Sequence, residues 1–406
     1  MTTRERTTRL TQYEVLRYLG HGGMAELLLA RATGPEGFEK LVVLKKIVPQ
    51  LASDARHVRL FLDEARLAAC LDHPNIVHVH DLGLVDTDYC YAMEYVHGAT
   101  LSRVLERHEL PIAIAIQIAA AVAAGLHHAH ERRGHDGQPL GVVHRDVSPS
   151  NILVSYEGGV KLIDFGIAKA ANSSIRTMTG VLKGKPGYVA PEQAGGHAVD
   201  RRTDVFALGA VLWEMLTGLP LFEAASVTEL AVHAPAPPSA VRRDCPRELD
   251  AIVLRALAFV PDQRYQTAQE LQRALEELAR ELRLDQSSLA LADHMHAVFG
   301  DATRRLEVPE TSAVTRTDLI SGAPQRDSFD DESSTIAVLP EHTVVEERTR
   351  IVTRPYRTTK RIDSPRQSHL LAAMFVIVLI LTAVVVRPLI ARSGADDKSL
   401  VRTPRK

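Results

Sequence analysis

Two acidic residues and an amide, Asp146, Asn151 and Asp164, lie close together in the sequence. Short apolar runs stand on both sides of the pair Gly158-Gly159, which predicts a β-hairpin with one polar loop before it and another after it. We expect the two loops to bring the three polar side chains to one cleft. Such a set suits phosphoryl transfer, because magnesium takes oxygen ligands and the attacking hydroxyl needs a carboxylate to orient it. The sequence therefore predicts Asp164 and Asn151 as metal ligands and Asp146 as the catalytic carboxylate.

The order of these residues resembles the catalytic core of eukaryotic-like (Hanks-type) protein kinases, in which His-Arg-Asp, a downstream Asn and Asp-Phe-Gly follow one another. The resemblance covers roughly residues 13–282. It implies an α+β, bilobal protein kinase fold, with a small β-rich N-lobe over 13–97 and a large helical C-lobe over 98–282. It also implies ATP with Mg²⁺, or Mn²⁺, in the cleft between the lobes.

A glycine-rich turn near the start of the chain is the first candidate for phosphate binding. Glycines let backbone N–H groups approach phosphate oxygens without interference from a Cβ atom. The spacing of Gly20 and Gly22 alone is a weak indication, since turns between strands often carry glycine. The turn resembles the kinase glycine-rich loop, with Ala25 in the place of its third glycine. The resemblance implies that the nucleotide is bound by Leu19, Gly20, His21, Gly22 and Gly23.

Lys45 lies in an apolar run that predicts a strand and matches the strand lysine of kinases. A buried ammonium needs anionic partners, which the phosphates and a helix carboxylate can provide. Glu64 fits the helical spacing of the neighbouring apolar residues, whereas the alternative, Asp63, falls one position off it. By strand alternation, Lys46 faces the opposite side and is expected to be solvated.

The run that ends at Val96 resembles the kinase hinge, which receives adenine on its backbone. The resemblance implies contacts at Glu94 and Val96, with Leu27, Val43 and Leu153 on the two faces of the base. An edge strand that merely leaves the small lobe is the alternative.

Residues 111–130 are rich in alanine and other apolar residues and predict a buried helix. Three histidines, His127, His128 and His130, interrupt the segment too strongly for a membrane span. No Cys or acidic residue stands beside them at a spacing that fits zinc, so we do not expect a zinc site.

The segment before Glu192 is rich in hydroxyl groups and resembles a kinase activation loop that ends in Ala-Pro-Glu. Arg145 precedes the catalytic carboxylate and supplies a cation for a phosphate on this loop. The candidate phosphorylation sites are Thr177 and Thr179, followed by Ser173 and Ser174. A loop that is only flexible is the alternative.

The resemblance also assigns structural roles to three charged residues. Asp204 corresponds to the aspartate that holds the catalytic loop through backbone hydrogen bonds. Arg264 corresponds to the arginine that pairs with the glutamate of Ala-Pro-Glu, here Glu192.

One position departs from the family pattern. Ser148 stands where most of these kinases carry a lysine that contacts the transferred phosphate. Losing one preorganised donor at a developing charge lowers the rate by about a hundred- to a thousandfold. Lys185, in Gly-Lys-Pro-Gly-Tyr, takes the usual place of a threonine that faces the same region. We hypothesise that Lys185 is catalytic and supplies the missing cation; a solvated Lys185 and a slower enzyme are the alternative.

The composition fits a chain of two lobes with appendages. The chain has 406 residues and a formal net charge of −2, which gives no bulk attraction to nucleic acid. Three widely spaced cysteines form neither a CxxC motif nor a disulfide framework and suit a reducing compartment. Residues 1–12 predict a disordered tail, without the apolar region of a signal peptide.

The C-terminal part changes character. We expect an additional helix over 283–300 and then a disordered juxtamembrane linker over 301–368, whose composition is too polar to bury a core. Residues 369–390 predict a single transmembrane helix, with apolar side chains contributing about −5 kcal/mol to insertion; a buried core helix is the alternative. Residues 391–406 form a short tail. Because kinase chemistry needs cytosolic ATP, the kinase domain is expected on the cytoplasmic side of the inner (plasma) membrane.

The sequence thus predicts a serine/threonine protein kinase that acts on protein substrates and phosphorylates its own activation loop in membrane-associated signalling. Self-association is one expected route to activation. Tyrosine specificity is disfavoured, because the activation loop offers Ser and Thr and the catalytic loop lacks an Ala-Ala-Arg pattern. A pseudokinase scaffold is the alternative from another class. A small-molecule kinase is disfavoured by the Ala-Pro-Glu segment.

Overall fold

The computed structural model describes most of the first 303 residues. The chain divides into two units, Met1–Pro340 and Glu341–Lys406, and all described residues belong to the first. They are residues 10, 12–85, 87–166, 186–222 and 235–303. The predicted linker, transmembrane helix and C-terminal tail lie outside them, apart from residues 301–303.

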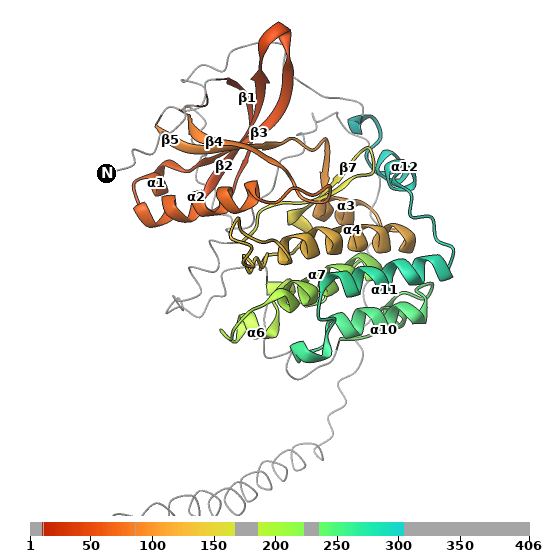
Figure 1. The fold of residues 1–406 in the computed structure, drawn as a ribbon. Helices are drawn as coiled ribbons and strands as arrows, with labels where there is room; N and C mark the ends of the chain where they lie inside the picture. Colours follow the sequence, from red (N-terminus) through yellow and green to blue (C-terminus); the bar gives the residue numbers. More distant parts are fainter. Residues whose placement is uncertain (1–9, 11, 86, 167–185, 223–234, 304–406) are drawn as a thin grey trace, which may run out of the picture. The chain divides into compact units, whose positions relative to one another are not determined.

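The N-lobe is a five-stranded antiparallel sheet in the order β1-β2-β3-β5-β4 (Figure 1). Its strands are β1 (Tyr13–His21), β2 (Ala25–Thr33), β3 (Glu39–Ile47), β4 (Val79–Val85) and β5 (Asp88–Glu94). Both faces of β3 are buried, since Val43 lies in one apolar cluster and Val42 and Leu44 in another. This explains why the strand reads as a continuous apolar run rather than as an alternating one.

Strand β4 begins at Val79, because the backbone just before it, at Ile76 and Val77, pairs with Leu162 of the C-lobe. One detail of the N-lobe differs from the sequence-based expectation. Leu10, expected in a disordered tail, is 3% exposed, and its N–H donates to the carbonyl of Leu84 at 2.9 Å.

Helices α1 (Pro49–Ala52) and α2 (Ala55–Ala69) accompany this sheet. The side chain of Asp54 caps α2 by accepting a hydrogen bond from the N–H of Arg56. Phe61 and Ala65 are buried on the face of α2 that packs against the sheet, and Glu64 lies beside them. The helix therefore brings one carboxylate to the same side of the sheet as Lys45.

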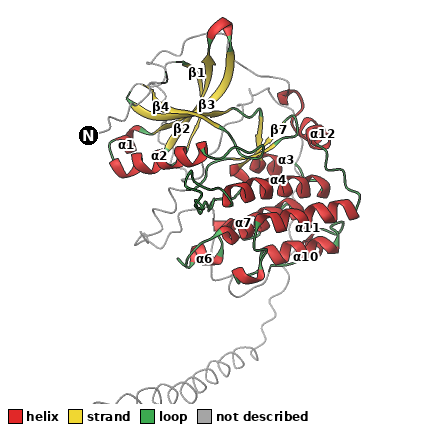
Figure 2. Ribbon diagram, in the orientation of Figure 1, coloured by secondary structure: helices red, strands yellow, loops and turns green. Residues whose placement is uncertain are grey.

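The C-lobe is mostly helical (Figure 2). Its helices are α3 (Leu101–Arg107), α4 (Ile112–His130), α6 (Pro191–Ala194), α7 (Arg201–Thr217), α9 (Pro238–Val241), α10 (Arg247–Ala256), α11 (Ala268–Glu281) and α12 (Ser288–Phe299). A small sheet of β6 (Gly98–Thr100), β7 (Ile152–Ser155) and β8 (Val160–Leu162) borders the cleft. The predicted two-lobed α+β architecture is confirmed.

Helix α4 lies in the core of the C-lobe. Among the described residues it is the one helix long and apolar enough to cross a membrane, with a mean hydropathy of 1.7, yet 61% of that stretch is buried in the protein. Its neighbours include α7 and α11. The prediction of a core helix over 111–130 is confirmed.

Candidate active site

The loop that carries Asp146 is held in place by a buried carboxylate at the start of α7. Asp204, fully buried at the start of α7, accepts hydrogen bonds from the backbone N–H groups of His144 and Arg145, each at 2.8 Å. The predicted contact between Asp204 and the catalytic loop is therefore present. A third donor, His130 Nε2, lies 2.7 Å from the same carboxylate. Burial raises the pKa of Asp204, but the hydrogen bond and charge of His130, together with the charge and backbone N–H of His144, outweigh burial and hold this pKa below its usual range.

His130 is a residue whose role the sequence did not reveal. Its position suggested only an interruption of an apolar helix. The structure places it on the last turn of α4, 4% exposed and aimed at Asp204.

Two residues of the site adopt left-handed backbone conformations. Arg145 has φ 64° and Asp164 has φ 56°, which costs a non-glycine residue about 1–2 kcal/mol. The bond from the N–H of Arg145 to Asp204 and the bond from Gln193 to its carbonyl hold the first of these in place. Backbone strain thus falls on the two segments that carry the predicted catalytic and metal-binding carboxylates.

Asn151 links the catalytic loop to the metal-binding segment. Its side-chain Nδ2 donates to the carbonyl oxygen of Asp146 at 2.9 Å and to Asp146 Oδ2 at 3.0 Å. Its backbone carbonyl accepts from the N–H of Ile163, next to Asp164. Because the amide nitrogen is used in the loop, the oxygen Oδ1 is the atom suited to a metal. The oxygen donors of Asn151 and Asp164 fit the preference of Mg²⁺.

Lys45 forms ion pairs with two carboxylates in the cleft. Its Nζ lies 2.7 Å from Glu64 Oε1 and 2.7 Å from Asp164 Oδ1. Burial lowers the pKa of Lys45, but the carboxylates of Asp164 and Glu64 more than compensate and raise it well above its usual range. The ammonium therefore stays charged. The alternative partner, Asp63, is wrong, because its carboxylate is about half exposed and pairs with Arg66.

Lys46 corrects another expectation. Its Nζ lies 3.1 Å from Asp88 Oδ2, and only 20% of its side chain is exposed. It does face away from Lys45, but the first residue of β5 supplies a carboxylate on that side. The prediction of a solvated Lys46 is wrong.

Tyr91 is a further residue that the sequence did not single out. It lies opposite Lys45 in the pairing of β3 with β5, is 2% exposed, and donates its hydroxyl to Glu64 Oε1 at 2.9 Å. Burial and the Glu64 carboxylate raise the pKa of Tyr91 well above its usual range, so the hydroxyl remains a donor. The oxygen that pairs with Lys45 is thus held by a second, uncharged donor.

We expect Tyr91→Phe to lower kcat/KM about tenfold, because a hydrogen bond to a charged group is worth about 1.5 kcal/mol or more. Steady-state kinetics with varied ATP would measure it. Tyr89→Phe on the same strand is the control, since the Tyr89 hydroxyl has no hydrogen-bond partner in the described part of the chain. Equal losses in the two variants would contradict the role given to Tyr91.

The apolar residues predicted for the nucleotide pocket come together from both lobes. Leu19, Leu27, Val43 and Leu153 are each buried and share one cluster with Met93. Leu19 and Ala25, on either side of the turn from β1 to β2, both belong to this cluster. A Cβ atom added to Gly23 in this turn would meet no neighbour within 4 Å. Gly22 closes the turn by donating its N–H to the carbonyl of Ala25 at 2.7 Å. Gly20 and His21 end β1.

The hinge segment joins the two lobes after β5. This strand pairs with β3 on one side and β4 on the other, so the alternative of an edge strand is wrong. The Glu94 side chain is engaged by Lys161 Nζ at 2.8 Å and by the N–H of His78 at 3.3 Å. A contact of Glu94 or Val96 with adenine would therefore use backbone groups, as predicted.

Ser148 contributes no positive charge to the cleft. It is 1% exposed, its Oγ lies 3.2 Å from Ser150 Oγ, and its carbonyl accepts from the N–H of Asn151. The other residues discussed for this region lie outside the described residues: Lys185, Thr177, Thr179, Ser173 and Ser174.

The predicted pair of Arg264 and Glu192 is present and buried. Two guanidinium nitrogens each lie 2.8 Å from one carboxylate oxygen, and the remaining N–H groups donate to backbone carbonyls of Ala258, Phe259 and Arg202. Burial raises the pKa of Glu192, but the hydrogen bonds and charge of Arg264, together with the backbone hydrogen bond of Glu192 and the Thr203 hydroxyl, outweigh burial and hold this pKa below its usual range. The pair fixes the segment after the activation loop to the C-lobe core.

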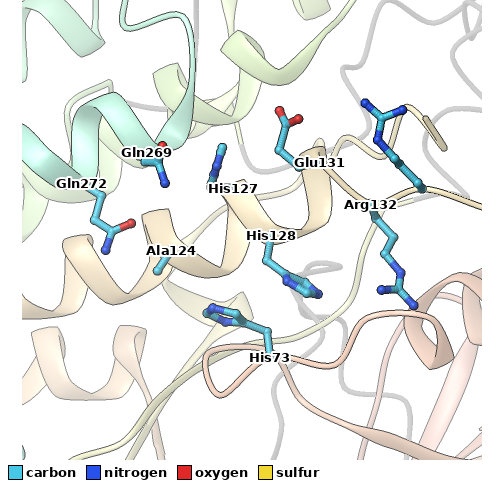
Figure 3. Close-up of a pocket in the computed structure, with 9 residues that line it drawn as sticks. His73, Ala124, His127, His128, Glu131, Arg132, Gln269 and Gln272 are labelled. Atoms are coloured by element: carbon cyan, nitrogen blue, oxygen red, sulfur yellow. The ribbon is translucent and has the colours of Figure 1, made fainter. Parts of the chain in front are cut away.

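A separate pocket of about 600 Å³ lies against α4 and α11 (Figure 3). His73 and His128, which line it, lie next to each other with ring centres 5.0 Å apart. Burial lowers the pKa of both rings, which disfavours their charged forms. None of the predicted site residues that the structure describes lines this pocket.

Known proteins resemble this chain over the part that builds the site. The sequence model of the protein kinase domain family matches residues 13–275. Tyrosine-protein kinase MasK of Myxococcus xanthus is 43% identical over 316 residues, which are 75% of this chain and 49% of that protein. Serine/threonine-protein kinase PknB of Mycobacterium leprae is 40% identical over 270 residues, 64% of this chain and 42% of that protein. The chain spans less than half the length of either relative.

A solved structure also resembles this chain over most of its described residues. The kinase domain of Mycobacterium tuberculosis PknI matches with a TM-score of 0.51 and 32% sequence identity, covering 66% of this chain and 96% of that one.

Proposed function

The chain belongs to the protein kinase domain family, and we propose on this basis that it transfers the γ-phosphoryl group of ATP to serine or threonine hydroxyls of proteins. The observation that carries the proposal is the contact of Lys45 with both Glu64 and Asp164, beside a catalytic loop that Asn151 holds in place.

Each residue of the site then has one task. Asp146 accepts a hydrogen bond from the substrate hydroxyl and aims its oxygen at the phosphorus. Lys45, kept charged and positioned by Glu64, binds the phosphates of the nucleotide. Asp164 and Asn151 hold Mg²⁺ or Mn²⁺, which neutralises charge on the phosphates when bound. The apolar cluster with Leu27, Val43 and Leu153 encloses the base.

Hydroxyl specificity is the point on which the relatives differ in name. PknB and Bacillus subtilis PrkC, 36% identical over 266 residues, are named serine/threonine kinases, whereas MasK is named a tyrosine kinase. The Ser/Thr assignment is supported by the catalytic loop, which lacks the Ala-Ala-Arg pattern of tyrosine-type kinases. Acid hydrolysis of the autophosphorylated chain should release phosphoserine and phosphothreonine. Phosphotyrosine alone would overturn the assignment.

Lys185 enters the proposal as a catalytic residue. The buried, uncharged Ser148 leaves the place of the usual lysine without a cation, and Lys185 is the nearest candidate by family position. We expect Lys185→Ala to lower kcat about a hundredfold, the effect of removing one donor from the developing charge. Phosphorylation of a peptide substrate would measure it, with Lys183→Ala in the same loop as control. A variant as fast as the parent would rule the role out.

The pseudokinase scaffold remains the second candidate. The buried and uncharged Ser148 is the observation that favours it. The complete set of Lys45, Glu64, Asp146, Asn151 and Asp164 favours catalysis.

We further propose that residues 369–390 anchor the chain in the inner membrane with the kinase domain in the cytoplasm, and that neighbouring copies phosphorylate each other's activation loops. The sequence from Leu370 to Val386, which is mostly apolar and carries no charge, supports the anchor. After cell fractionation the protein should stay in the membrane pellet through a carbonate wash. Recovery in the soluble fraction would contradict the anchor.

A further inference from the structure

Helix α12 follows the range 13–275 that matches the kinase family, yet it is built into the C-lobe. Leu291, Met295 and Phe299 are buried in the main apolar cluster. Before the helix, Gln286 donates its side-chain amide to the carbonyl of Ala113 at 2.9 Å, which ties the connection to the start of α4. Figure 1 shows α12 beside β7 and α3.

The first turn of α12 presses on the turn between β7 and β8. Gly158 occupies this turn with φ 82°, and a Cβ atom there would overlap the carbonyl oxygen of Ser288. Only glycine fits a position that combines this backbone conformation with so close a neighbour. The hairpin and the helix are therefore in direct backbone contact.

The last turn of α12 reaches the hinge through a row of rings. The ring centres are 5.7 Å apart for Phe299 and Tyr156, 4.9 Å apart for Tyr156 and His97, and 6.5 Å apart for His97 and Tyr95. The N–H of Tyr156 also donates to the carbonyl of His97 at 2.9 Å. We call Phe299, Tyr156, His97 and Tyr95 the aromatic row. It connects α12 to the residue between Glu94 and Val96.

Strand β7, which lies between these two contacts, turns one face to the nucleotide pocket and the other to the C-lobe core. Leu153 of β7 lies in the cluster of the nucleotide pocket, whereas Ile152 and Val154 lie in the C-lobe cluster that includes Phe299. This is the alternation of a strand buried on both faces. The cluster that contains Phe299 therefore supports the face of β7 opposite Leu153, the side chain expected on one face of the base.

We propose that α12 positions the hinge and the floor of the nucleotide pocket, so that its docking through Phe299 sets the affinity for Mg²⁺-ATP; the proposal rests on the function assigned above. Phe299 is a positioning residue, since it acts through Tyr156 and β7.

The test compares the full chain with Phe299→Ala and with Leu289→Ala, whose side chain on the same helix is 68% exposed. Titration with a non-hydrolysable ATP analogue and Mg²⁺ should show the Kd raised about three- to tenfold by Phe299→Ala, the range that one aromatic pair supports, and unchanged by Leu289→Ala. KM for ATP should rise by the same factor, with kcat changed less than twofold. Phe299→Leu keeps an apolar side chain and serves if Phe299→Ala does not fold.

Hydrogen exchange of residues 288–299 in the same samples shows whether α12 has loosened. Faster exchange together with an unchanged Kd would overturn the proposal, and so would a fall in kcat with an unchanged KM. If the parent chain itself failed to bind the analogue, the assigned function would fail instead.

Discussion

Asp146→Asn should lower kcat for peptide phosphorylation about a thousandfold while leaving the Kd for Mg²⁺-ATP within a factor of two. A positioned carboxylate contributes about 10²–10⁴ to the rate of such a step. The asparagine keeps an oxygen that can accept from Asn151 Nδ2, so the loop should retain its geometry. Lys45, Glu64 and Asp164 bind one another without Asp146, which is why nucleotide affinity should survive.

Asp63→Asn is the matched control for this change. It makes the same replacement of a carboxylate by an amide on an exposed face of α2, where Arg66 Nη1 lies 3.3 Å from Asp63 Oδ1. Radiolabelled ATP and a peptide substrate give the rates. An Asp146→Asn variant that remains as fast as Asp63→Asn would show that Asp146 is not the catalytic carboxylate.

Arg264→Ala should lower the free energy of unfolding by about 3–5 kcal/mol, the effect of removing one partner from a buried ion pair. The guanidinium is fully buried and makes five hydrogen bonds, two of them to Glu192. Without it the Glu192 carboxylate stays in the interior beside the single hydroxyl of Thr203. Such a loss is a large part of the 5–15 kcal/mol that stabilises a typical domain.

Denaturant unfolding monitored by circular dichroism would measure this loss, with Arg66→Ala as the control. The Arg66 pair with Asp63 is half exposed and should be worth less than about 1 kcal/mol. The pKa of Glu192 is depressed in the folded chain, so the contribution of the pair is present above the usual carboxyl value of 4.5 and is lost as the pH falls through the lower folded value. The difference in the free energy of unfolding between the parent and Arg264→Ala should therefore become smaller below pH 4.5. An equal loss in the free energy of unfolding for Arg264→Ala and Arg66→Ala would contradict the stabilising role of the buried pair.

The sequence could predict those parts of the site whose residues follow one another in fixed order. Asp146, Asn151 and Asp164 lie on either side of one hairpin, so local spacing is enough to bring them together. Helix periodicity favoured Glu64 over Asp63, but the pairing of Glu64 with Lys45 was implied by the resemblance to protein kinases. The two-lobed fold was implied by the same resemblance.

Contacts between distant elements could not be predicted in this way. His130 and Asp204 are 74 positions apart and meet only because α4 and α7 pack side by side. Tyr91 reaches Glu64 through the pairing of β5 with β3, which no local pattern specifies. The ion pair of Lys46 with Asp88 has the same origin, and so does the contact of Gly158 with α12.

The most direct test of the nucleotide site is a calorimetric titration of the full chain with ATP in the presence and absence of divalent metal. We predict that the chain takes up one nucleotide with Mg²⁺ or Mn²⁺, and that Asp164→Ala or removal of the metal weakens binding at least tenfold. Absence of nucleotide uptake by the folded parent chain with either metal would contradict the assignment of this site.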